Sequence, residues 1–263
     1  MSDNTEDASW VIEQGTNALV STRVSQFPYY DQALGEPDWK GRKILDFGGN
    51  NGGFLAGSGN QINLDDYWCM DIVRAALEDG RKRYPDAHFV HYNRYNSEYN
   101  PEGTRYEPVP DCGLKFDFIL PFSVFTHIHR SELLDLVAQL RSQLAPDGVL
   151  AFTFTDPGYD TGLSIFPSGH YMLKLLTVLR RDYPELDVEE IHNRACQADW
   201  AVLIDDQLWV EPGDELCQQE REGRSLESYC AYYSADYMAS LFPDAQIQPP
   251  TGEEWQHCCI LGR

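Results

Sequence analysis

A short apolar segment that runs into a cluster of glycines constrains this chain more than any other feature. Residues 43–47 read Lys-Ile-Leu-Asp-Phe, which is typical of a buried strand in length and content. Glycines follow at positions 48, 49, 52 and 53. Because glycine tolerates backbone conformations that other residues avoid, this run predicts a sharp turn where the backbone can approach a ligand closely. In a doubly wound sheet, ligands bind at the carboxyl ends of strands, where such a turn lies.

A second apolar segment is followed by an acidic residue, at a separation along the sequence that is typical of nucleoside-binding sites. Residues 67–70 read Tyr-Trp-Cys-Met and predict a strand that ends at Asp71, 19 residues after Gly52. An acidic side chain about 20 residues after a glycine turn is placed to accept hydrogen bonds from ribose hydroxyls. The two elements together therefore indicate a nucleoside-containing ligand, although a glycine turn without any ligand is the alternative.

This pair of elements resembles the S-adenosylmethionine site of class I methyltransferases, where an acidic residue precedes three glycines at alternating positions. Asp46, Gly48 and Gly52 match that pattern, and Asn50 replaces the middle glycine. A dinucleotide site uses that glycine to approach a pyrophosphate, so Asn50 counts against a nicotinamide-dependent oxidoreductase. S-adenosylmethionine has no phosphate and is compatible with Asn50. A non-catalytic binding protein with the same fold is the other alternative, and the intact acidic and glycine residues count against it.

The resemblance implies an α/β fold, a Rossmann-like doubly wound sheet of seven strands with the last strand antiparallel. Apolar runs at the expected places are residues 43–47, 67–70, 88–93, 115–120, 149–155, 245–248 and 257–261. We expect helices over 72–83, after a cap at Ser131, and over 235–242 after Ser234. Residues 145–148 read as a turn. Residues 94–113 lack a helical period where the family usually has a helix, and long loops of this kind are often functional.

Three parts of the chain are predicted. Residues 1–40 form an N-terminal helical cap, with apolar groups at 10–12 and 18–20 and an aromatic cluster at 27–30 that packs on the domain edge. Residues 41–157 and 233–263 form the methyltransferase domain. Residues 158–232 form an insertion with an apolar helix face over 172–179, a hairpin of 201–204 with 207–210, and a polar run at 214–224.

The position of the insertion after strand five, at the cofactor face, favours a role as a lid or acceptor pocket. It would bring Phe166, His170, Tyr171 and Trp209 near the transferred methyl group. The alternative is that the segment packs on the far side, as an oligomer contact or as decoration, and the oligomeric state stays open.

The resemblance further implies that S-adenosyl-L-methionine is the cofactor. Asp71 would bind the ribose, the glycine turn would hold the methionine end, and Asp46 would help to hold its ammonium group. Tyr92 or Asn93 would meet the adenine. The full set of implied cofactor-binding residues is Asp46, Phe47, Gly48, Gly49, Gly52, Asp71, Ile72, Tyr92, Asn93, Pro121 and Phe122.

Methyl transfer needs alignment of the acceptor with the methyl group, and a general base helps if the acceptor is a hydroxyl. Histidine titrates near neutral pH and suits that role. His127, which follows strand four, is the first candidate. The further candidates are His170 and Asp156, followed by His129 and His192. A purely structural role is the alternative for each.

The overall charge restricts the acceptor. A formal net charge of −22 repels nucleic-acid phosphates and anionic membrane surfaces, so a small-molecule acceptor is expected, most simply a hydroxyl of a natural product or sugar. No run of about 18 apolar residues predicts a membrane span. The polar N-terminus, the odd count of seven cysteines and the lack of C-x-x-C spacing predict reduced thiols and a cytoplasmic location. No metal-ligand spacing is present.

Overall fold

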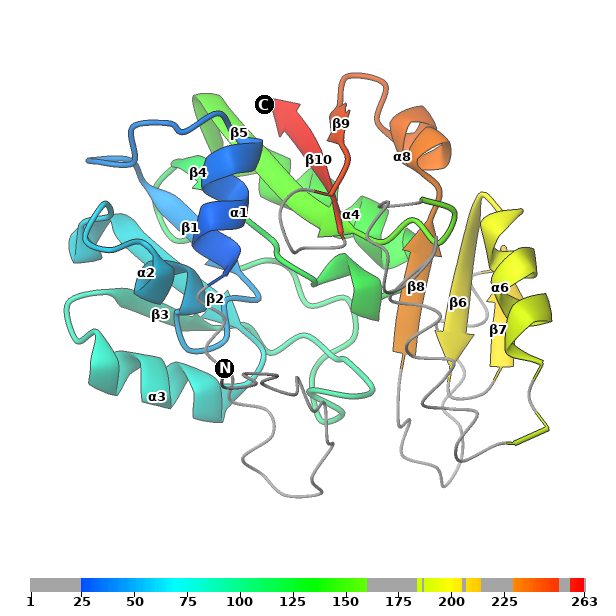
Figure 1. The fold of residues 1–263 in the computed structure, drawn as a ribbon. Helices are drawn as coiled ribbons and strands as arrows, with labels where there is room; N and C mark the ends of the chain where they lie inside the picture. The colour runs from blue at the N-terminus through cyan, green and yellow to red at the C-terminus, as the bar shows by residue number, and fades with distance from the viewer. Residues whose placement is uncertain are drawn as a thin grey trace, which may run out of the picture.

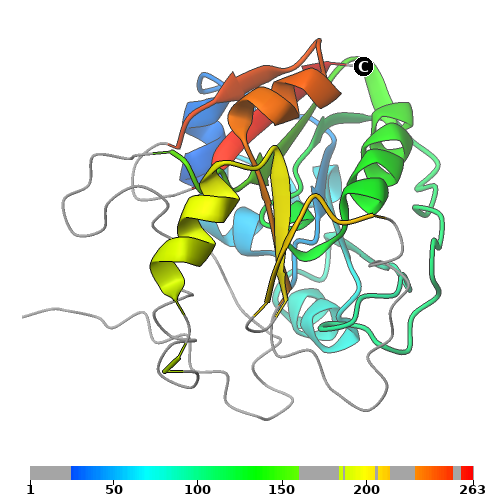
Figure 2. The same cartoon turned by 90° about the vertical axis from the view of Figure 1, so that its right-hand side faces the viewer.

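The computed structural model describes residues 25–159, 184–185, 187–204, 207–213, 229–250 and 256–262. These residues form a seven-stranded sheet with helices on both faces and a three-stranded sheet at its flank (Figures 1 and 2). Several predictions lie outside the described residues: the helices near 10–12, 18–20 and 172–179, the hairpin turn at 205–206, the polar run at 214–224, and the side chains of Phe166, His170 and Tyr171.

The large sheet has the strand order β3-β2-β1-β4-β5-β10-β9. Its strands are β1 (Ile44–Phe47), β2 (Tyr67–Asp71), β3 (His88–His91), β4 (Phe116–Ile119), β5 (Leu144–Phe154), β9 (Gln246–Gln248) and β10 (His257–Gly262). The first five strands pair in parallel, whereas β10 is antiparallel to both β5 and β9. This topology confirms the predicted Rossmann-like doubly wound sheet with an antiparallel last strand.

Alternating side chains on each strand build a separate core on each face of this sheet. Ile44 packs with the helices α1 (Gln26–Ala33), α2 (Gly53–Gly57) and α3 (Arg74–Arg83), whereas its neighbour Leu45 packs with α4 (Arg130–Ser142) and α8 (Ala235–Leu241). Successive side chains of a strand point to opposite faces, so both cores follow from the continuous apolar runs. Two short 3₁₀ turns, η1 (Leu64–Asp66) and η2 (Phe125–His127), precede β2 and α4.

The predicted aromatic cluster near the N-terminus forms the helix α1 and packs on the edge of the domain. Phe27, Tyr29 and Tyr30 are all buried. Their rings contact Phe54 of α2 and Phe122, which follows β4, with centroid separations of 5.3 to 6.0 Å. Aromatic contacts of this kind stabilise the packing beyond the area that they bury. The helix α1 is thereby held beside the turn that follows β1.

The insertion contributes a small antiparallel sheet with the order β7-β6-β8, formed by β6 (Trp200–Ile204), β7 (Gln207–Val210) and β8 (Tyr229–Tyr233). The predicted pairing of 201–204 with 207–210 is confirmed. One face of this sheet joins the core around α4, and the other face packs under α6 (Val188–Cys196). In Figure 2 it lies against the flank of the main sheet, with β8 next to η2.

Two local predictions were wrong in detail. Residues 145–148 do not form a turn before the strand, because β5 already begins at Leu144, which pairs with Phe116, and the extra residues are absorbed as a bulge before Val149 pairs with Phe118. Helix α4 begins at Arg130 rather than after a cap at Ser131. Its cap is His129, whose Nδ1 accepts a hydrogen bond of 3.2 Å from the backbone N–H of Ser131.

Among the described helices, none combines the length and the apolar content that a membrane crossing requires.

Candidate active site

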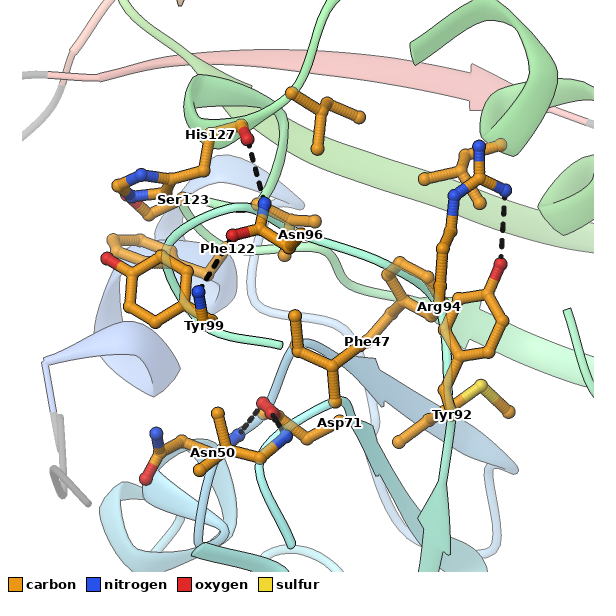
Figure 3. A pocket seen from close by; sticks show the side chains of 18 of the residues that line it. Phe47, Asn50, Asp71, Tyr92, Arg94, Asn96, Tyr99, Phe122, Ser123 and His127 are labelled. Carbon is orange, nitrogen blue, oxygen red and sulfur yellow. Dashed lines mark hydrogen bonds between the residues drawn. The ribbon is translucent and has the colours of Figure 1, made fainter. Parts of the chain in front are cut away.

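A cavity of about 240 Å³ lies at the carboxyl ends of the central strands (Figure 3). Its walls come from the segments that follow β1, β2, β3 and β4, together with Gln26 of α1. The strand β1 lies between β2 and β4. The chain runs from β1 outward through β2 to β3 and then returns to β4 on the other side of β1, so the strand order reverses at this point. Open α/β sheets bind their ligands at such a reversal.

The glycine turn forms the floor of the cavity, and its backbone leaves no space for side chains. Gly48 has φ +76°, and a Cβ added there would overlap the side chain of Val124. A Cβ added at Gly49 would overlap the carboxyl group of Asp46. The backbone N–H of Gly48 also donates a hydrogen bond of 2.7 Å to the carbonyl of Met70 at the end of β2. The turn is therefore fixed, and at Gly48 and Gly49 only main-chain atoms face the cavity.

Asp71 lies at the end of β2 and lines the cavity beside the glycine turn. One carboxyl oxygen accepts a hydrogen bond of 2.7 Å from the backbone N–H of Asn50, and the other accepts one of 2.7 Å from Val73 (Figure 3). Burial raises the pKa of this carboxyl group, against the lowering effect of these backbone donors. Each oxygen keeps a lone pair that a ligand hydroxyl could use.

Asp46 is buried behind the turn and does not line the cavity. Its carboxyl group accepts a hydrogen bond from the hydroxyl of Tyr67 on β2. Burial, with a smaller contribution from the charge of Asp71, raises the pKa of Asp46 to about 7. The side chain therefore supports the glycine turn from below, and Gly49 separates it from the cavity.

The other predicted cofactor residues divide into two groups. Phe47, Ile72, Tyr92 and Phe122 line the cavity together with Gly48, Gly49 and Asp71. The second group, Gly52, Asn93 and Pro121, does not line the cavity, and the backbone of each residue has a structural role instead. Gly52 caps α2 with φ +89°, the carbonyl of Asn93 accepts from Thr104, and the carbonyl of Pro121 accepts from Thr153.

His127 is the predicted catalytic residue that lines the cavity. It belongs to η2, and its Nδ1 lies 3.1 Å from the backbone carbonyl oxygen of Tyr229 on β8. A carbonyl can only accept a hydrogen bond, so this contact places the ring proton on Nδ1 and leaves the lone pair on Nε2. The ring thus has the tautomer in which Nε2 can take a proton.

The remaining catalytic candidates lie elsewhere or are not described. Asp156 accepts hydrogen bonds from the backbone of Gly158 and of Ala235, at the start of α8, and it does not line the cavity. His129 caps α4, and His192 contacts Cys196 on α6. Trp209 lies on β7, the strand of the small sheet farthest from η2. His170 lies outside the described residues.

Several cavity residues were not identified as candidates from the sequence. Gln26 is 7% exposed, and its Oε1 is buried without a hydrogen-bond partner among the described residues. Arg94 is 4% exposed and is neutralised by Asp135 and Glu132 at 3.1 and 3.4 Å. Tyr95, Asn96, Tyr99 and Ser123 are further polar residues of the lining that were not identified. The length of the loop after β3 was the only sequence signal that pointed to any of them.

The comparison with protein families decides the class of this domain. A family model described as a methyltransferase domain matches residues 45–150, which include the glycine turn, Asp71 and His127. The chain carries a class I S-adenosylmethionine-dependent methyltransferase domain. The methyltransferase is therefore an enzyme of the predicted class, and S-adenosyl-L-methionine is its cofactor. This match also removes the nicotinamide-dependent oxidoreductase that the sequence left as an alternative.

Solved structures share the fold of the methyltransferase at low sequence identity. The PH0226 protein from Pyrococcus horikoshii OT3 matches with a TM-score of 0.51 and 12% identity, covering 94% of this chain and 95% of that one. An S-adenosylmethionine-dependent methyltransferase from Clostridium acetobutylicum ATCC 824 matches with a TM-score of 0.48 and 12% identity, covering 94% of both chains. At this identity the likeness to PH0226 establishes the fold alone.

The methyltransferase is shorter than some of the proteins that it resembles. The pyocyanin biosynthetic protein PhzM matches with a TM-score of 0.49 and 11% identity over 91% of this chain, which spans only 55% of the length of PhzM. No curated protein sequence matches the chain.

Proposed function

We propose that this methyltransferase transfers the methyl group of S-adenosyl-L-methionine to a hydroxyl of a small molecule, such as a natural product or a sugar. The observation that carries this proposal is the environment of His127. Its ring lines the cavity, and the carbonyl of Tyr229 holds the proton on Nδ1. A histidine in this state can accept the proton that a hydroxyl loses as its oxygen is methylated.

The described residues fit the cofactor at three points. The glycine turn presents a backbone without side chains, where a Cβ would clash with Asp46 or Val124. Asp71 offers carboxyl oxygens for ribose hydroxyls. Gln26 offers a buried amide oxygen without a partner among the described residues, and such an atom is costly to leave unsatisfied. Because Gly49 separates Asp46 from the cavity, Gln26 is a better acceptor for the ammonium group than Asp46.

The chemistry that the cofactor supplies is an electrophilic methyl group on a sulfonium. The protein positions the acceptor against this methyl group, since alignment alone can contribute about 7–11 kcal/mol to a reaction barrier. Phe122, Tyr99 and Ile128 line the cavity near His127 and restrict the acceptor. His127 Nε2 takes the hydroxyl proton, and the ring keeps its Nδ1 proton on the Tyr229 carbonyl.

The charge of the protein supports a small acceptor. A net charge of −22 opposes the approach of a nucleic acid or an anionic membrane. Cys69, Cys112, Cys196, Cys230, Cys258 and Cys259 are free thiols. Reduced thiols are typical of a cytoplasmic enzyme, and we retain that location in the proposal.

The cofactor part of the proposal is tested by Asp71→Ala. Loss of hydrogen bonds to a charged group costs about 1.5–3 kcal/mol, so we expect binding of S-adenosylhomocysteine to weaken by more than tenfold. Calorimetry on the folded variant measures this. Glu78→Ala, which removes an exposed carboxylate from α3 outside the cavity lining, is the matched control. Absence of binding to the wild type, or equal affinity of the Asp71→Ala variant, contradicts the cofactor assignment.

The predicted domain division is retained as part of the proposal, with residues 1–40 as the cap, 41–157 and 233–263 as the methyltransferase domain, and 158–232 as the insertion. The insertion is proposed to shape the acceptor side and to contribute little to cofactor binding. Among the described residues, the insertion approaches the cavity through β8, where the carbonyl oxygen of Tyr229 contacts His127. The cofactor residues precede it in the chain.

Hydrogen exchange tests this division. S-adenosylhomocysteine alone should protect the backbone amides of residues 46–53, because the ligand restrains the glycine turn, and should leave β6 and β7 unchanged. Strong protection of β6 and β7 by the cofactor product alone, with little change at 46–53, would assign the insertion to cofactor binding.

A further inference from the structure

The loop after β3 is ordered by backbone bridges and by side-chain to backbone hydrogen bonds rather than by a helix. Arg94 and Thr104 form an isolated bridge, and Asn96 and Asn100 form another within it. The side-chain amide of Asn100 donates a hydrogen bond of 2.9 Å to the carbonyl of Arg94. Asparagine side chains stabilise turns in this way. The loop therefore has a defined conformation in which individual side chains are directed at neighbouring elements.

Asn96 links this loop to His127. Its side-chain N–H donates a hydrogen bond of 3.0 Å to the backbone carbonyl of His127. Its side-chain oxygen accepts hydrogen bonds of 3.0 and 2.9 Å from the backbone N–H groups of Glu98 and Tyr99. Figure 3 shows Asn96 between His127 and Tyr99, with its hydrogen bonds to the His127 carbonyl and the Tyr99 N–H. The turn that carries Glu98 is thus joined to the backbone of the histidine.

The Glu98 carboxylate lies next to the histidine ring. Its Oε2 is 3.6 Å from Nδ1 of His127, and the two side chains are 23% and 24% exposed. This oxygen is buried and has no hydrogen-bond partner among the described residues. The same Nδ1 is 3.1 Å from the Tyr229 carbonyl. Two acceptors, one of them anionic, therefore share the side of the ring that points away from Nε2.

We propose that Glu98 is the positioning residue for His127 in the methyl transfer. This inference rests on the proposed function. As the C–O bond to the acceptor forms and the C–S bond breaks, the electron pair of that bond stays on sulfur, and the hydroxyl proton moves to Nε2 of His127. The ring becomes an imidazolium, and the Glu98 carboxylate offsets its positive charge. The proton then leaves to solvent, and the ring returns to its neutral state.

Other groups around the histidine do not supply this charge. The titratable neighbours are Tyr99 on the same loop, with its ring 5.2 Å from the histidine ring, and Tyr229 and Cys230 on β8. Burial, followed by the nearby charge of Glu98, raises the pKa of Cys230 to about 12. The thiol therefore stays neutral at physiological pH. Among these described neighbours, Glu98 is the anion.

The test is the ring state of His127, read from ¹⁵N spectra of histidine-labelled protein between pH 5 and 9, with His127→Gln to assign its signals. In the wild type, the neutral ring should carry its proton on Nδ1. In Glu98→Gln, which keeps the shape and removes the charge, the ring should take up its second proton at a lower pH than in the wild type. Glu102→Gln, which removes an exposed carboxylate from the same loop, should leave the titration unchanged.

Each outcome bears on the proposal. A neutral ring with its proton on Nε2 would overturn it with wild-type protein alone, even if the variant failed to fold. Equal titration of His127 in wild type and Glu98→Gln would also overturn it. The affinity for S-adenosylhomocysteine separates this result from a failure of the proposed function, because Glu98 does not line the cavity and the variant should bind the ligand as the wild type does.

Discussion

Between about pH 4 and about pH 7, the free energy of unfolding of this methyltransferase should fall relative to that of its Asp46→Asn variant. Burial raises the pKa of Asp46 to about 7 in the folded chain, whereas an unfolded aspartate titrates near 4. Between these values the folded state holds a proton that the unfolded state releases, so a higher pH favours unfolding. A pKa difference of about 3 units corresponds to on the order of 4 kcal/mol, which is fully lost above pH 7.

Urea denaturation at several pH values, followed by tryptophan fluorescence, measures this dependence. Burial also raises the pKa values of Asp71 and Glu132, which acts in the same direction, and it lowers the pKa of His257 to about 4, which raises stability over the same pH range. The difference between the wild type and Asp46→Asn therefore isolates the contribution of Asp46. Asp86→Asn, at an exposed position in the turn before β3, is the control and should keep the wild-type slope. An Asp46→Asn protein with the wild-type slope would show that Asp46 titrates alike in both states.

The same residue illustrates what local sequence can and cannot predict. The glycine turn and Asp71 were predictable, because backbone freedom and the end of a strand are local properties of the chain. The burial of Asp46 was not. It depends on the pairing of β1 with β2, which brings Tyr67 to Ile44 in register and its hydroxyl to Asp46. A pattern along one strand does not contain the side chain that its neighbour supplies.

The fold was predicted well because the apolar runs specify strands and the faces of helices. The differences arose where tertiary pairing overrides a local signal. Ala-Pro-Asp-Gly at 145–148 has turn chemistry, yet β4 pairs with β5 on both sides of it, and the segment becomes a bulge. Likewise Ser131 is a good cap residue, but the side chain of His129 accepts from the backbone N–H of Ser131, so the helix begins at Arg130 and Ser131 lies in its first turn.

The loop that supplies Glu98 shows a different limit. Its sequence has no helical period, and its conformation depends on the side chains of Asn96 and Asn100. Asn100 bonds to Arg94 within the loop, whereas Asn96 bonds both to Tyr99 within the loop and to His127 on η2. The sequence indicated a functional loop from its length but not which side chains reach the cavity. Gln26 was missed for a related reason, since the aromatic cluster predicts packing of α1 and not which residue of that helix faces the ligand.

Replacement of His127 should have the largest effect on turnover. We expect His127→Gln to lower the rate of S-adenosylhomocysteine formation by about 10²–10⁴-fold, the usual cost of losing a general base, while the affinity for S-adenosylhomocysteine stays the same. The assay supplies S-adenosylmethionine and a panel of small alcohols and phenols. The physical reason is the ring state, since Nδ1 donates to Tyr229 and Nε2 remains to accept the hydroxyl proton.

His88→Gln is the matched control for this variant. His88 begins β3 and stacks on Trp68 with a centroid separation of 4.2 Å, at the end of the sheet opposite the cavity. The control should keep full turnover, because the carboxyl ends of the strands hold the site. If His127→Gln also keeps full turnover from pH 6 to 9, the hydroxyl needs no base from this residue, and alignment with the methyl group suffices. A loss of turnover that is accompanied by an equal loss of S-adenosylhomocysteine affinity would instead place His127 in cofactor binding.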